Sequence, residues 1–328
     1  MTMTNRETRS VYAVVGSGYM GGGIAQALAL SGAEVRVADV DLEVARSNRE
    51  RLITEAQQYS REGLFPDHAA DTIAEQLTAA TVEDAVVGAS FIEEAVPEKI
   101  QIKHTTLARI SAAADPTAII GTNTSTILIR ELAEAVTNPA RFLGVHFSNP
   151  APFIPGVELI PHDHTKPSVV ASVERIIEST GKQIAVVKDA VGFVLNRLQY
   201  ALFHEATQLV EEGVATPDDI DTIVRTTFGF RLPFFGPFAI ADMAGLDVYA
   251  FCYASLQTAF PERFATPQIL KELVDAGALG TKSGAGFLDI PADRTHELTA
   301  YRNKAYVAMG ELLRELGPAP ARVAERGR

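Results

Sequence analysis

Cysteine is almost absent from this chain, which has one, Cys252, in 328 residues. A single thiol cannot form a disulfide within its own chain, so we expect no disulfide framework of the kind that small secreted domains use. Long apolar runs are lacking too, and no apolar segment follows Met1 that would act as a secretion signal. The sequence therefore favours neither secretion nor a membrane span, and we expect a cytoplasmic location.

Positive charge is the second shortage. Lys and Arg number 29 against 41 Asp and Glu, which gives a formal net charge of −12, and no cluster of basic residues forms a positive face. Nucleic acids and anionic membranes bind to such faces, so we expect neither as a partner.

We expect no bound metal either. The first ten residues are expected to be a disordered leader, and the tail after Gly317 is expected to fray.

What the chain does have is a glycine-rich turn near its start. A short apolar run at 11–15 predicts a buried strand, the pattern from about 20 to 31 predicts a helix, and 35–39 predicts the next strand. Between the first strand and the helix, Gly16, Gly18 and Gly21 have the spacing G-x-G-x-x-G. In this context the first glycine permits a tight turn, the second lets the backbone approach a pyrophosphate, and the third allows close helix packing. The start of the helix then offers free N–H groups to phosphates.

Asp39 extends this motif. It lies eighteen positions after Gly21, close to the spacing of about 20 at which an acid binds the adenosine ribose. Its carboxylate would accept hydrogen bonds from both ribose hydroxyls and repel a 2′-phosphate, so the sequence predicts NAD rather than NADP as cofactor. The alternative is a glycine-rich turn that binds nothing. The agreement of strand, turn, helix, second strand and acid speaks against it.

Strands and helices alternate from 11 to about 188, which predicts an α/β fold with a Rossmann-type, doubly wound, mostly parallel sheet. A helical excursion at about 42–76 interrupts this pattern, and Val86-Val87 with Phe91-Ile92 are expected to mark a strand and its approach. Beyond 188 only helices are expected, and the main ones lie at 191–212, from 216, at 238–258, 267–276 and 299–316. We therefore expect an NAD-binding domain at 1–188 and an all-helical substrate and dimerisation domain at 189–328.

His146 is the best placed of the histidines. It lies at the end of a predicted strand, and Glu158 follows twelve positions later on the next one, so a hairpin would bring the two together. A carboxylate on one ring nitrogen fixes the tautomer and stabilises the imidazolium. The other nitrogen can then take a proton from an alcohol as its hydride leaves. The pattern leaves a purely structural hairpin open. The remaining histidines are expected to be surface or packing residues; they are His68, His104, His162, His164, His204 and His296.

Several motifs, in order along nearly the whole chain, resemble those of the 3-hydroxyacyl-CoA dehydrogenases. The matching segments are the glycine motif, Asn123-Thr-Ser125, His146-Phe-Ser-Asn-Pro150 with Val157-Glu158, Asp189 to Asn196, Gly236-Pro-Phe with Asp242 and Gly245-Leu-Asp247, and Gly280 to Phe287. The resemblance implies a dehydrogenase that uses NAD. Under it, the catalytic role of the His146–Glu158 pair becomes the favoured interpretation.

The resemblance also implies roles for single residues. His146 would be the general base for the carbinol proton and Glu158 its orienting partner, while Ser125 and Asn196 would bind the reacting oxygen. The implied cofactor contacts are Gly16, Gly18, Tyr19, Met20, Gly21, Asp39, Glu98, Lys103, Asn123, Ser125 and Asn149. For two of these residues a purely structural role stays open. Lys103 has the character of a solvated helix residue, and Asn196 that of a residue capping its own helix.

Departures from the family pattern concern the substrate. The family usually has a second Phe where Ser148 stands, and the excursion around 54–66, which grips CoA in the family, is poor in lysine here. Arg61 alone falls near a phosphate-contacting position. A CoA thioester needs cationic groups for its phosphates. Ser148, Pro155 and the 242–247 segment instead resemble relatives that act on small free carboxylates, among them carnitine, gulonate and hydroxymethyl- or formyl-pyridine carboxylate dehydrogenases.

Four hypotheses follow. The first is an NAD-dependent dehydrogenase of a 3-hydroxyacyl-CoA or related β-hydroxy acid derivative, and the second is a dehydrogenase of a small, CoA-free hydroxy acid or hydroxymethyl compound. The third is a non-catalytic NAD-binding structural protein, against which the intact set of site residues speaks. The fourth is a β-hydroxyacid dehydrogenase with a catalytic lysine on the domain-linking helix, but no Lys lies between 191 and 212. Apolar residues on the later helices predict a homodimer through the second domain.

Overall fold

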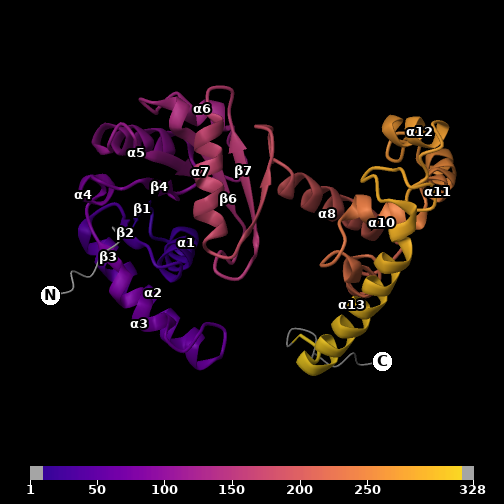
Figure 1. Cartoon of the computed structure of the whole chain (residues 1–328), viewed down its shortest axis with the longest axis horizontal. Coiled ribbons are helices and arrows are strands. Elements are labelled where there is room, and N and C mark those ends of the chain that lie inside the picture. Colours follow the sequence, from indigo (N-terminus) through magenta and orange to yellow (C-terminus); the bar gives the residue numbers. More distant parts are fainter. Residues whose placement is uncertain (1–9, 320–328) are drawn as a thin grey trace. The chain divides into compact units, whose positions relative to one another are not determined.

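The structure is a computed structural model that describes residues 10–319, and the chain divides into two compact units, Met1–Leu202 and Phe203–Arg328 (Figure 1). The first unit contains a mostly parallel sheet with helices, and the second contains helices, as the sequence predicts. The domain boundary expected at 188/189 stays a prediction. The expected N-terminal leader lies almost wholly outside the described residues, as does most of the C-terminal tail.

The first unit is built on an eight-stranded sheet. Its strands are β1 (Val11–Val15), β2 (Glu34–Ala38), β3 (Leu77–Ala79), β4 (Phe91–Glu94), β5 (Ile119–Thr122), β6 (Phe142–Phe147), β7 (Gly156–Pro161) and β8 (Gln183–Val186). They lie in the order β3-β2-β1-β4-β5-β6-β7-β8. All neighbours are parallel except β6 and β7, which are antiparallel and pair His146 with Glu158. The hairpin expected around these two residues is therefore present.

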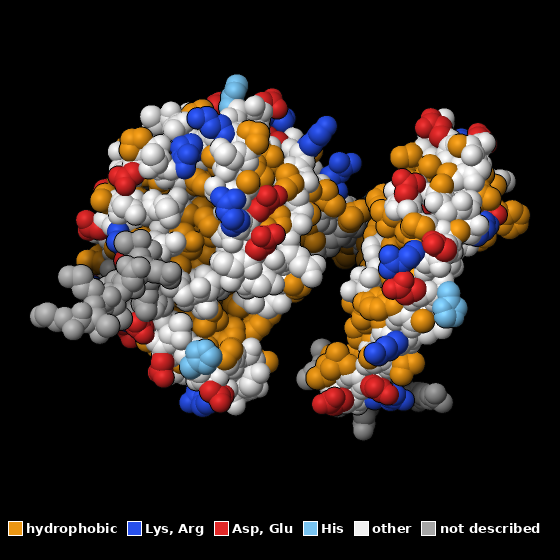
Figure 2. Space-filling model, viewed as in Figure 1, with side chains coloured by type: hydrophobic (Ala, Val, Ile, Leu, Met, Phe, Trp, Pro, Cys, Tyr) orange, Lys and Arg blue, Asp and Glu red, His pale blue; other side chains and the backbone are white. Residues whose placement is uncertain are grey.

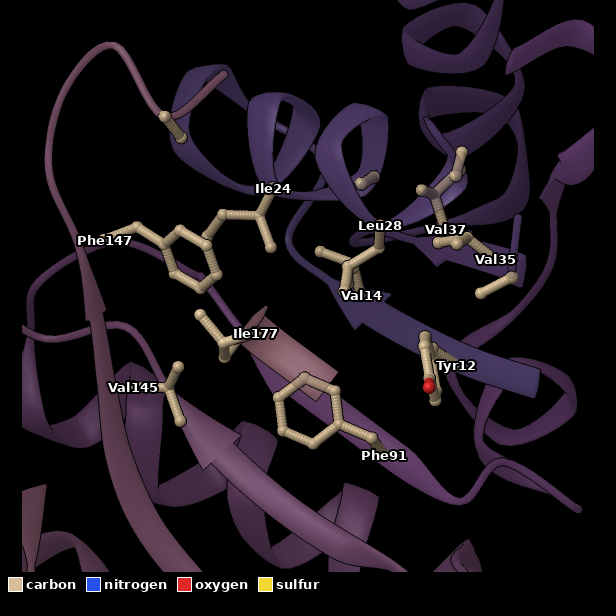
Figure 3. Close-up of a cluster of buried hydrophobic side chains, with 14 of the residues drawn as sticks. Tyr12, Val14, Ile24, Leu28, Val35, Val37, Phe91, Val145, Phe147 and Ile177 are labelled. Carbon is tan, nitrogen blue, oxygen red and sulfur yellow. The ribbon is translucent and has the colours of Figure 1, made fainter. Parts of the chain in front are cut away.

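Helices cover both faces of this sheet. They are α1 (Tyr19–Leu30), α2 (Leu42–Arg61), α3 (Ala69–Gln76), α4 (Val82–Val86), α5 (Ile100–Ala113), α6 (Ile129–Ala133), η1 (Pro139–Arg141) and α7 (Pro167–Glu178). One buried cluster joins α1, α2, α3 and α7 to the sheet, with Ile24 and Leu28 of α1 packed near Val14 of β1 (Figure 3). A second cluster joins α4, α5 and α6 to the other face, through residues such as Ala13 and Ile92. Alternate residues of one strand thus serve both cores, as expected for a parallel sheet buried on both sides.

The order of the strands determines where a ligand can bind. The chain runs outward from β1 to β2 and β3, then returns to β4 on the other side of β1. At such a reversal the connections after the two central strands diverge and leave a crevice at their carboxyl ends. Gly16 follows β1 and Ala95 follows β4, so both residues border this crevice.

Several elements differ from expectation. Val86 ends the short helix α4, which the Thr81 hydroxyl caps and which leads to β4; this helix was not expected. The three-residue edge strand β3 was not expected, because its residues share the pattern of the preceding helix and only pairing with β2 distinguishes them. The short helix α6 was not expected either. Tertiary contacts decide such short elements more than local propensity does.

The second unit contains helices and two turns of 3₁₀ helix. Its elements are α8 (Leu195–Glu211, which starts in the first unit), α9 (Pro217–Thr226), η2 (Gly229–Arg231), α10 (Pro237–Ala244), α11 (Leu246–Ala259), α12 (Gln268–Asp275), η3 (Ala292–Arg294) and α13 (Thr295–Leu316). The single helix expected at 238–258 is wrong, since Gly245, with φ of +102°, separates α10 from α11. That conformation favours glycine and cannot continue a right-handed helix. The helix expected from 216 is present, and the Thr216 hydroxyl caps α9 by accepting the N–H of Asp219.

Among the described residues, we find no single helix that combines the length and the apolar composition needed to cross a bilayer. The helices α10 and α11 meet that test of length and composition only when counted together, and they are bent by 101° where they join.

Candidate active site

The glycine turn after β1 has the geometry that the motif requires. Gly16 has φ of +99°, and a Cβ there would lie 2.6 Å from the backbone of Ala95. A Cβ on Gly21 would overlap the carbonyl oxygen of Gly16, whereas one on Gly18 would meet nothing within 4 Å. The first and third glycines are therefore needed for packing, and Gly18 leaves backbone open toward the crevice. Within the described chain no side chain caps the start of α1, so its first N–H groups remain available for an anion.

Asp39 lies beside this turn. Its Oδ2 accepts hydrogen bonds from the backbone N–H (2.8 Å) and the hydroxyl (2.7 Å) of Ser17, and its Oδ1 accepts from Val40 N. A carboxylate oxygen can accept more than one hydrogen bond, so the carboxylate can hold the turn and still accept from ribose hydroxyls. Asp39 is thus connected to the glycine motif in the manner expected of an NAD site.

A cavity of about 690 Å³ lies over this turn, lined entirely by residues of the first unit. Most of the expected cofactor residues line it, namely Gly16, Gly18, Tyr19, Met20, Asp39, Glu98, Asn123 and Ser125. The open backbone at Gly18, the start of α1 and the carboxylate of Asp39 fit a dinucleotide. When bound, NAD supplies the acceptor for a hydride. We find no group of His, Cys, Asp or Glu side chains placed to hold a metal in the part of the chain that is described.

His146 and Glu158 meet in the β6–β7 hairpin. His146 Nδ1 lies 2.8 Å from Glu158 Oε2, and both side chains are buried. Oε1 of the same carboxylate accepts the backbone N–H groups of Val194 (2.9 Å) and Leu195 (3.0 Å). Burial raises the pKa of Glu158, but the hydrogen bonds from His146 and from the two N–H groups outweigh it and hold that pKa below its usual range. The carboxylate is therefore charged at neutral pH and can hold a proton on Nδ1.

The same contact explains where α8 begins. The helix expected from Val191 starts at Leu195, so that expectation was wrong by about one turn. Gly192 has φ of +74° and Phe193 has φ of +46°, neither of which is helical. The Glu158 carboxylate lies at the start of the helix and binds its free N–H groups, an arrangement that stabilises a helix N-terminus.

Ser125 and Asn196 lie on the other side of the imidazole. Ser125 Oγ is 3.4 Å from His146 Nε2, a weak contact, and the Asn196 amide donates to the backbone carbonyl of Ser125 at 3.0 Å. Nδ1 faces Glu158, so Nε2 is the nitrogen that faces the hydroxyl. The structure thus brings together all four residues expected to be catalytic.

Glu98 and Lys103 are near each other but have different surroundings. Glu98 Oε1 accepts from the Thr124 hydroxyl and from the N–H groups of Ser125 and Thr126, and so holds the turn that carries Ser125. Burial raises the pKa of Glu98, but its hydrogen bond to Thr124 and the charge of Lys103 outweigh it and lower that pKa overall. Lys103 is not the solvated helix residue that the sequence allowed.

Lys103 is fully buried, and its Nζ lies 2.9 Å from Glu94 Oε1 and 3.2 Å from the Asn123 carbonyl. Lys103 has no exposed surface and is not among the residues that line the cavity, so a direct contact between Lys103 and the cofactor stays a prediction. Asn123 lines the cavity, and its Oδ1 accepts from Phe147 N at 2.9 Å, which joins the end of β5 to β6.

Asn149 and Arg61 are not among the residues that line this cavity. Asn149 is exposed in the loop after His146, and Arg61 is exposed in the last turn of α2. Their expected roles, contact with the nicotinamide side of the cofactor and contact with a substrate phosphate, stay predictions.

Two residues of the excursion support the glycine turn and were missed by the sequence reasoning. Arg51 Nη2 donates to the carbonyl of Ser17 at 3.0 Å, and the Asn48 amide donates to the Ser17 hydroxyl at 3.0 Å. Both lie on α2, where an Arg and an Asn on a charged helix give no distinguishing signal. Only the folding of α2 against the turn shows their role.

Comparisons with known proteins agree with this geometry. A model of the 3-hydroxyacyl-CoA dehydrogenase NAD-binding domain matches residues 11–190, and one of the C-terminal domain of that family matches residues 192–290. The chain is 35% identical over 303 residues to 5-formyl-3-hydroxy-2-methylpyridine 4-carboxylate 5-dehydrogenase of Mesorhizobium japonicum, covering 92% of this chain and 97% of that one. It is 34% identical to a probable 3-hydroxybutyryl-CoA dehydrogenase of Deinococcus radiodurans, covering 84% of this chain and 98% of the other.

A solved structure shows the same fold. The crystal structure of a 3-hydroxyacyl-CoA dehydrogenase from Archaeoglobus fulgidus superimposes with a TM-score of 0.77 at 30% identity, over 94% of this chain and 99% of that one. The glycine turn, the acid beside it and the matched domains together identify the cofactor as NAD. The chain belongs to the 3-hydroxyacyl-CoA dehydrogenase family and is an NAD-dependent oxidoreductase that acts on CH–OH groups.

Proposed function

We propose that His146 is the general base of this dehydrogenase and that Glu158 orients it. One observation carries the proposal: Nδ1 of a buried histidine lies 2.8 Å from a carboxylate, while Nε2 faces a serine hydroxyl beside the cofactor cavity. A base needs one nitrogen free of its proton and directed at the reacting hydroxyl. A carboxylate beside Nδ1 favours the tautomer that keeps Nε2 available for this role.

In the proposed reaction a secondary alcohol loses its hydroxyl proton to Nε2 of His146 as its carbon-bound hydrogen leaves as hydride for NAD. The C–O single bond becomes a carbonyl and His146 becomes an imidazolium, while bound NAD would supply the acceptor for the hydride. Glu158, held charged by its hydrogen bonds, stabilises that imidazolium. Ser125 and Asn196 hold the oxygen in place. In the reverse direction His146 returns the proton.

The proposed substrate is a 3-hydroxyacyl-CoA or a related β-hydroxy acid derivative. The named activities of relatives such as the 3-hydroxybutyryl-CoA dehydrogenases support this class. The four site residues would take and stabilise the hydroxyl proton, while bound NAD would accept the hydride from the adjacent carbon.

One observation favours a second class, a small carboxylate without CoA. The excursion at 42–76 contains no lysine, and its seven acidic residues outnumber its four arginines. Two of these arginines are already bound within the protein, since Arg49 donates to the carbonyls of Leu77 and Ala74 and Arg51 to that of Ser17. Few cations are therefore left on this surface for the phosphates of CoA. The name of the Mesorhizobium relative describes a free carboxylate as substrate.

A substrate panel tests these proposals. Steady-state rates would be measured with NADH and acetoacetyl-CoA, and with NAD and free hydroxy acids, including a hydroxymethyl-pyridine carboxylate. Binding energy from a remote group of the true substrate should appear in kcat/KM. If the free acid reacts as well as the CoA thioester, CoA contributes nothing and the CoA thioester is excluded as the preferred substrate. If NADH binds and no member of the panel reacts, the third hypothesis of a non-catalytic NAD-binding protein gains support.

We also propose that the chain forms a homodimer through its helical domain. Many large hydrophobic side chains are exposed on a single chain, and hydrophobic groups are visible on the surface in Figure 2. On the helical unit they include Phe251, 75% exposed, Ile223, 58% exposed, and Phe203, 63% exposed. Exposed patches of this kind mark interaction surfaces. Light scattering at micromolar concentration should give twice the mass of one chain, and a monomer would contradict the proposal. The cytoplasmic location stays a prediction.

A further inference from the structure

The loop between the two catalytic strands, residues 148–155, is packed on two sides. Toward α1, Ala151 and Pro152 lie so close to Gly23 that a Cβ there would be 3.2 Å from the Ala151 Cβ and 2.8 Å from a Pro152 ring carbon. Toward the excursion, the Phe153 ring makes an edge contact with Tyr59, with ring centroids 5.2 Å apart. The loop therefore touches both the helix that follows the glycine turn and the helices after β2.

A third contact fixes the backbone of the loop. Lys182, between α7 and β8, is 7% exposed, and its Nζ donates to the carbonyls of Ala151 and Ile154, each at 2.7 Å. The next residue, Gln183, donates its backbone N–H to the carbonyl of Pro155 at 2.8 Å. Three carbonyls of one loop are thus bound by two consecutive residues at the start of β8.

Lys182 is unusual in its surroundings. Among the residues that the structure describes it forms no ion pair with a carboxylate, and burial lowers its pKa. Removing an ammonium from water costs free energy that hydrogen bonds must offset. A methionine would fill the same space without this cost, so packing alone does not account for a lysine here. The two bonds to loop carbonyls are what the lysine adds.

The loop matters because of the residues that it connects. It begins directly after His146 and Phe147, carries Asn149, and returns to the strand of Glu158. The pairing of β6 with β7 holds His146 opposite Glu158 on its own. Nothing in that pairing holds Asn149, which lies beyond the last paired residue of β6. Its position depends on the path of the loop backbone.

We propose that Lys182 is a positioning residue for the dehydrogenase reaction, which holds the backbone of the 148–155 loop and with it Asn149, the residue expected to contact the nicotinamide side of the cofactor. The inference rests on the proposed function of the His146–Glu158 pair. Lys182 itself has no role in binding substrate or cofactor. It acts only through the loop carbonyls to which it donates hydrogen bonds.

The test compares three variants of the full-length enzyme. Lys182→Met removes the charge and the donors but keeps a similar length, and Lys182→Arg keeps both charge and donors. Lys166→Met is the matched control, because Lys166 lies at the other end of α7 and is exposed. Three quantities are measured for each: amide hydrogen exchange of 148–155 without ligand, NADH affinity by fluorescence, and kcat on whichever panel compound the unmodified enzyme turns over.

For Lys182→Met we expect faster exchange at Phe153 and Ile154, whose N–H groups bond within the loop, with unchanged exchange in β1 and β4. We expect kcat to fall about 10²-fold, as for a small misplacement caused by a change away from the reacting atoms, with NADH affinity within about threefold. Lys182→Arg should recover at least part of kcat, and Lys166→Met should match the unmodified enzyme.

Unchanged loop exchange in Lys182→Met would overturn the inference, whether or not any substrate is found, because exchange and NADH binding need no turnover. A fall in kcat that merely follows the loss of folded protein, with NADH affinity lost in parallel, would show a structural role only and would overturn it too. Failure of the proposed function is separate: it would appear as an unmodified enzyme that binds NADH and turns over no panel compound.

Discussion

The two units of this chain differ in how they are stabilised. The sheet unit has two extensive buried clusters, one on each face of the sheet. In the described part of the helical unit, the buried cluster is small and centres on Ala241, Leu246 and Leu270. The sheet unit also contains every contact of the His146 group and the whole cofactor cavity. One unit therefore has an extensive core and a site of its own, whereas the other exposes many large apolar side chains on the single chain.

The largest effect should come from His146→Gln, which tests whether the chemistry belongs to the sheet unit. Gln keeps a polar side chain but cannot accept a proton at neutral pH. We expect kcat to fall by about 10²–10⁴, with NADH affinity and the thermal unfolding of both units nearly unchanged. Stopped-flow and steady-state kinetics with fluorescence titration would measure this.

The control is His104→Gln, since among the described residues the His104 ring, on α5, forms a hydrogen bond with the carbonyl of Glu131 on α6 and none with a residue of the site. It should keep full turnover. A His146→Gln enzyme with near-normal kcat would remove His146 from the role of base.

The next effect concerns the helical unit alone. Asp242 is buried, and its carboxylate accepts the N–H groups of Phe287 (3.0 Å) and Leu288 (2.9 Å). Asp242→Ala leaves both donors unpaired, and we expect a loss of about 2–3 kcal/mol in the free energy of unfolding. Calorimetry should show this in the transition of the helical unit, while NADH still binds to the sheet unit.

Asp247→Ala provides the contrast for that experiment. Asp247 pairs with Lys282 at the surface, where ion pairs contribute little, so its loss should leave the transition almost unmoved. If the two variants were equally stable, the buried carboxylate would not be what holds the 280–288 segment against α10.

A smaller effect is expected at the cofactor site. Asp39→Ala removes the acceptor for ribose hydroxyls and also the two bonds from Ser17. Hydrogen bonds to charged groups contribute about 1.5–3 kcal/mol, so the Kd for NADH should rise roughly 10- to 100-fold. Discrimination against NADPH should fall at the same time, because the charge that repels its 2′-phosphate is gone. Equal losses for both cofactors would contradict the ribose assignment.

The smallest effect should be a gain in stability within the sheet unit. Glu93 is fully buried, and neither carboxylate oxygen has a hydrogen-bond partner among the described residues. Burial, and then the charge of Glu94, raise the pKa of Glu93 well above its ordinary value, although Lys103 opposes them. The folded chain therefore binds this proton more tightly than the unfolded chain does, and stability falls as pH rises above the ordinary pKa of a glutamate.

Glu93→Gln removes this penalty without changing the size of the side chain. We expect its melting temperature to exceed that of the unmodified protein by about 2–4 °C at pH 8, and the difference to shrink toward pH 5. Thermal scans across that range would measure it. A variant that is less stable at pH 8 would mean that the carboxylate has a partner it needs.

The parts of the fold that the sequence predicts well are those set by local pattern. The glycine turn and the acid after β2 depend on spacing within about thirty residues, and the structure places Gly16, Gly21 and Asp39 as that spacing requires. The His146–Glu158 hairpin depends on two neighbouring strands and a short loop. Each of these features needs little knowledge of the rest of the chain.

The features that sequence reasoning missed depend on contacts between distant segments. Lys103 has the character of a surface residue until Glu94 and Asn123 surround it. The bend between α10 and α11 follows from the left-handed conformation of Gly245, which an apolar helical pattern hides. Lys182 gives no signal in the sequence, because its partners are backbone carbonyls some thirty positions away.

The Glu158 side chain has two separate structural roles. One oxygen holds the imidazole, and the other receives the N–H groups that open α8, the helix that continues past Leu202. Even in a relative that no longer catalyses a reaction, replacement of this glutamate would leave the N–H groups at the start of α8 without their acceptor and destabilise that end of the helix. The presence of the glutamate is therefore no proof of activity. The histidine is the better marker when related sequences are divided into catalytically active and inactive proteins.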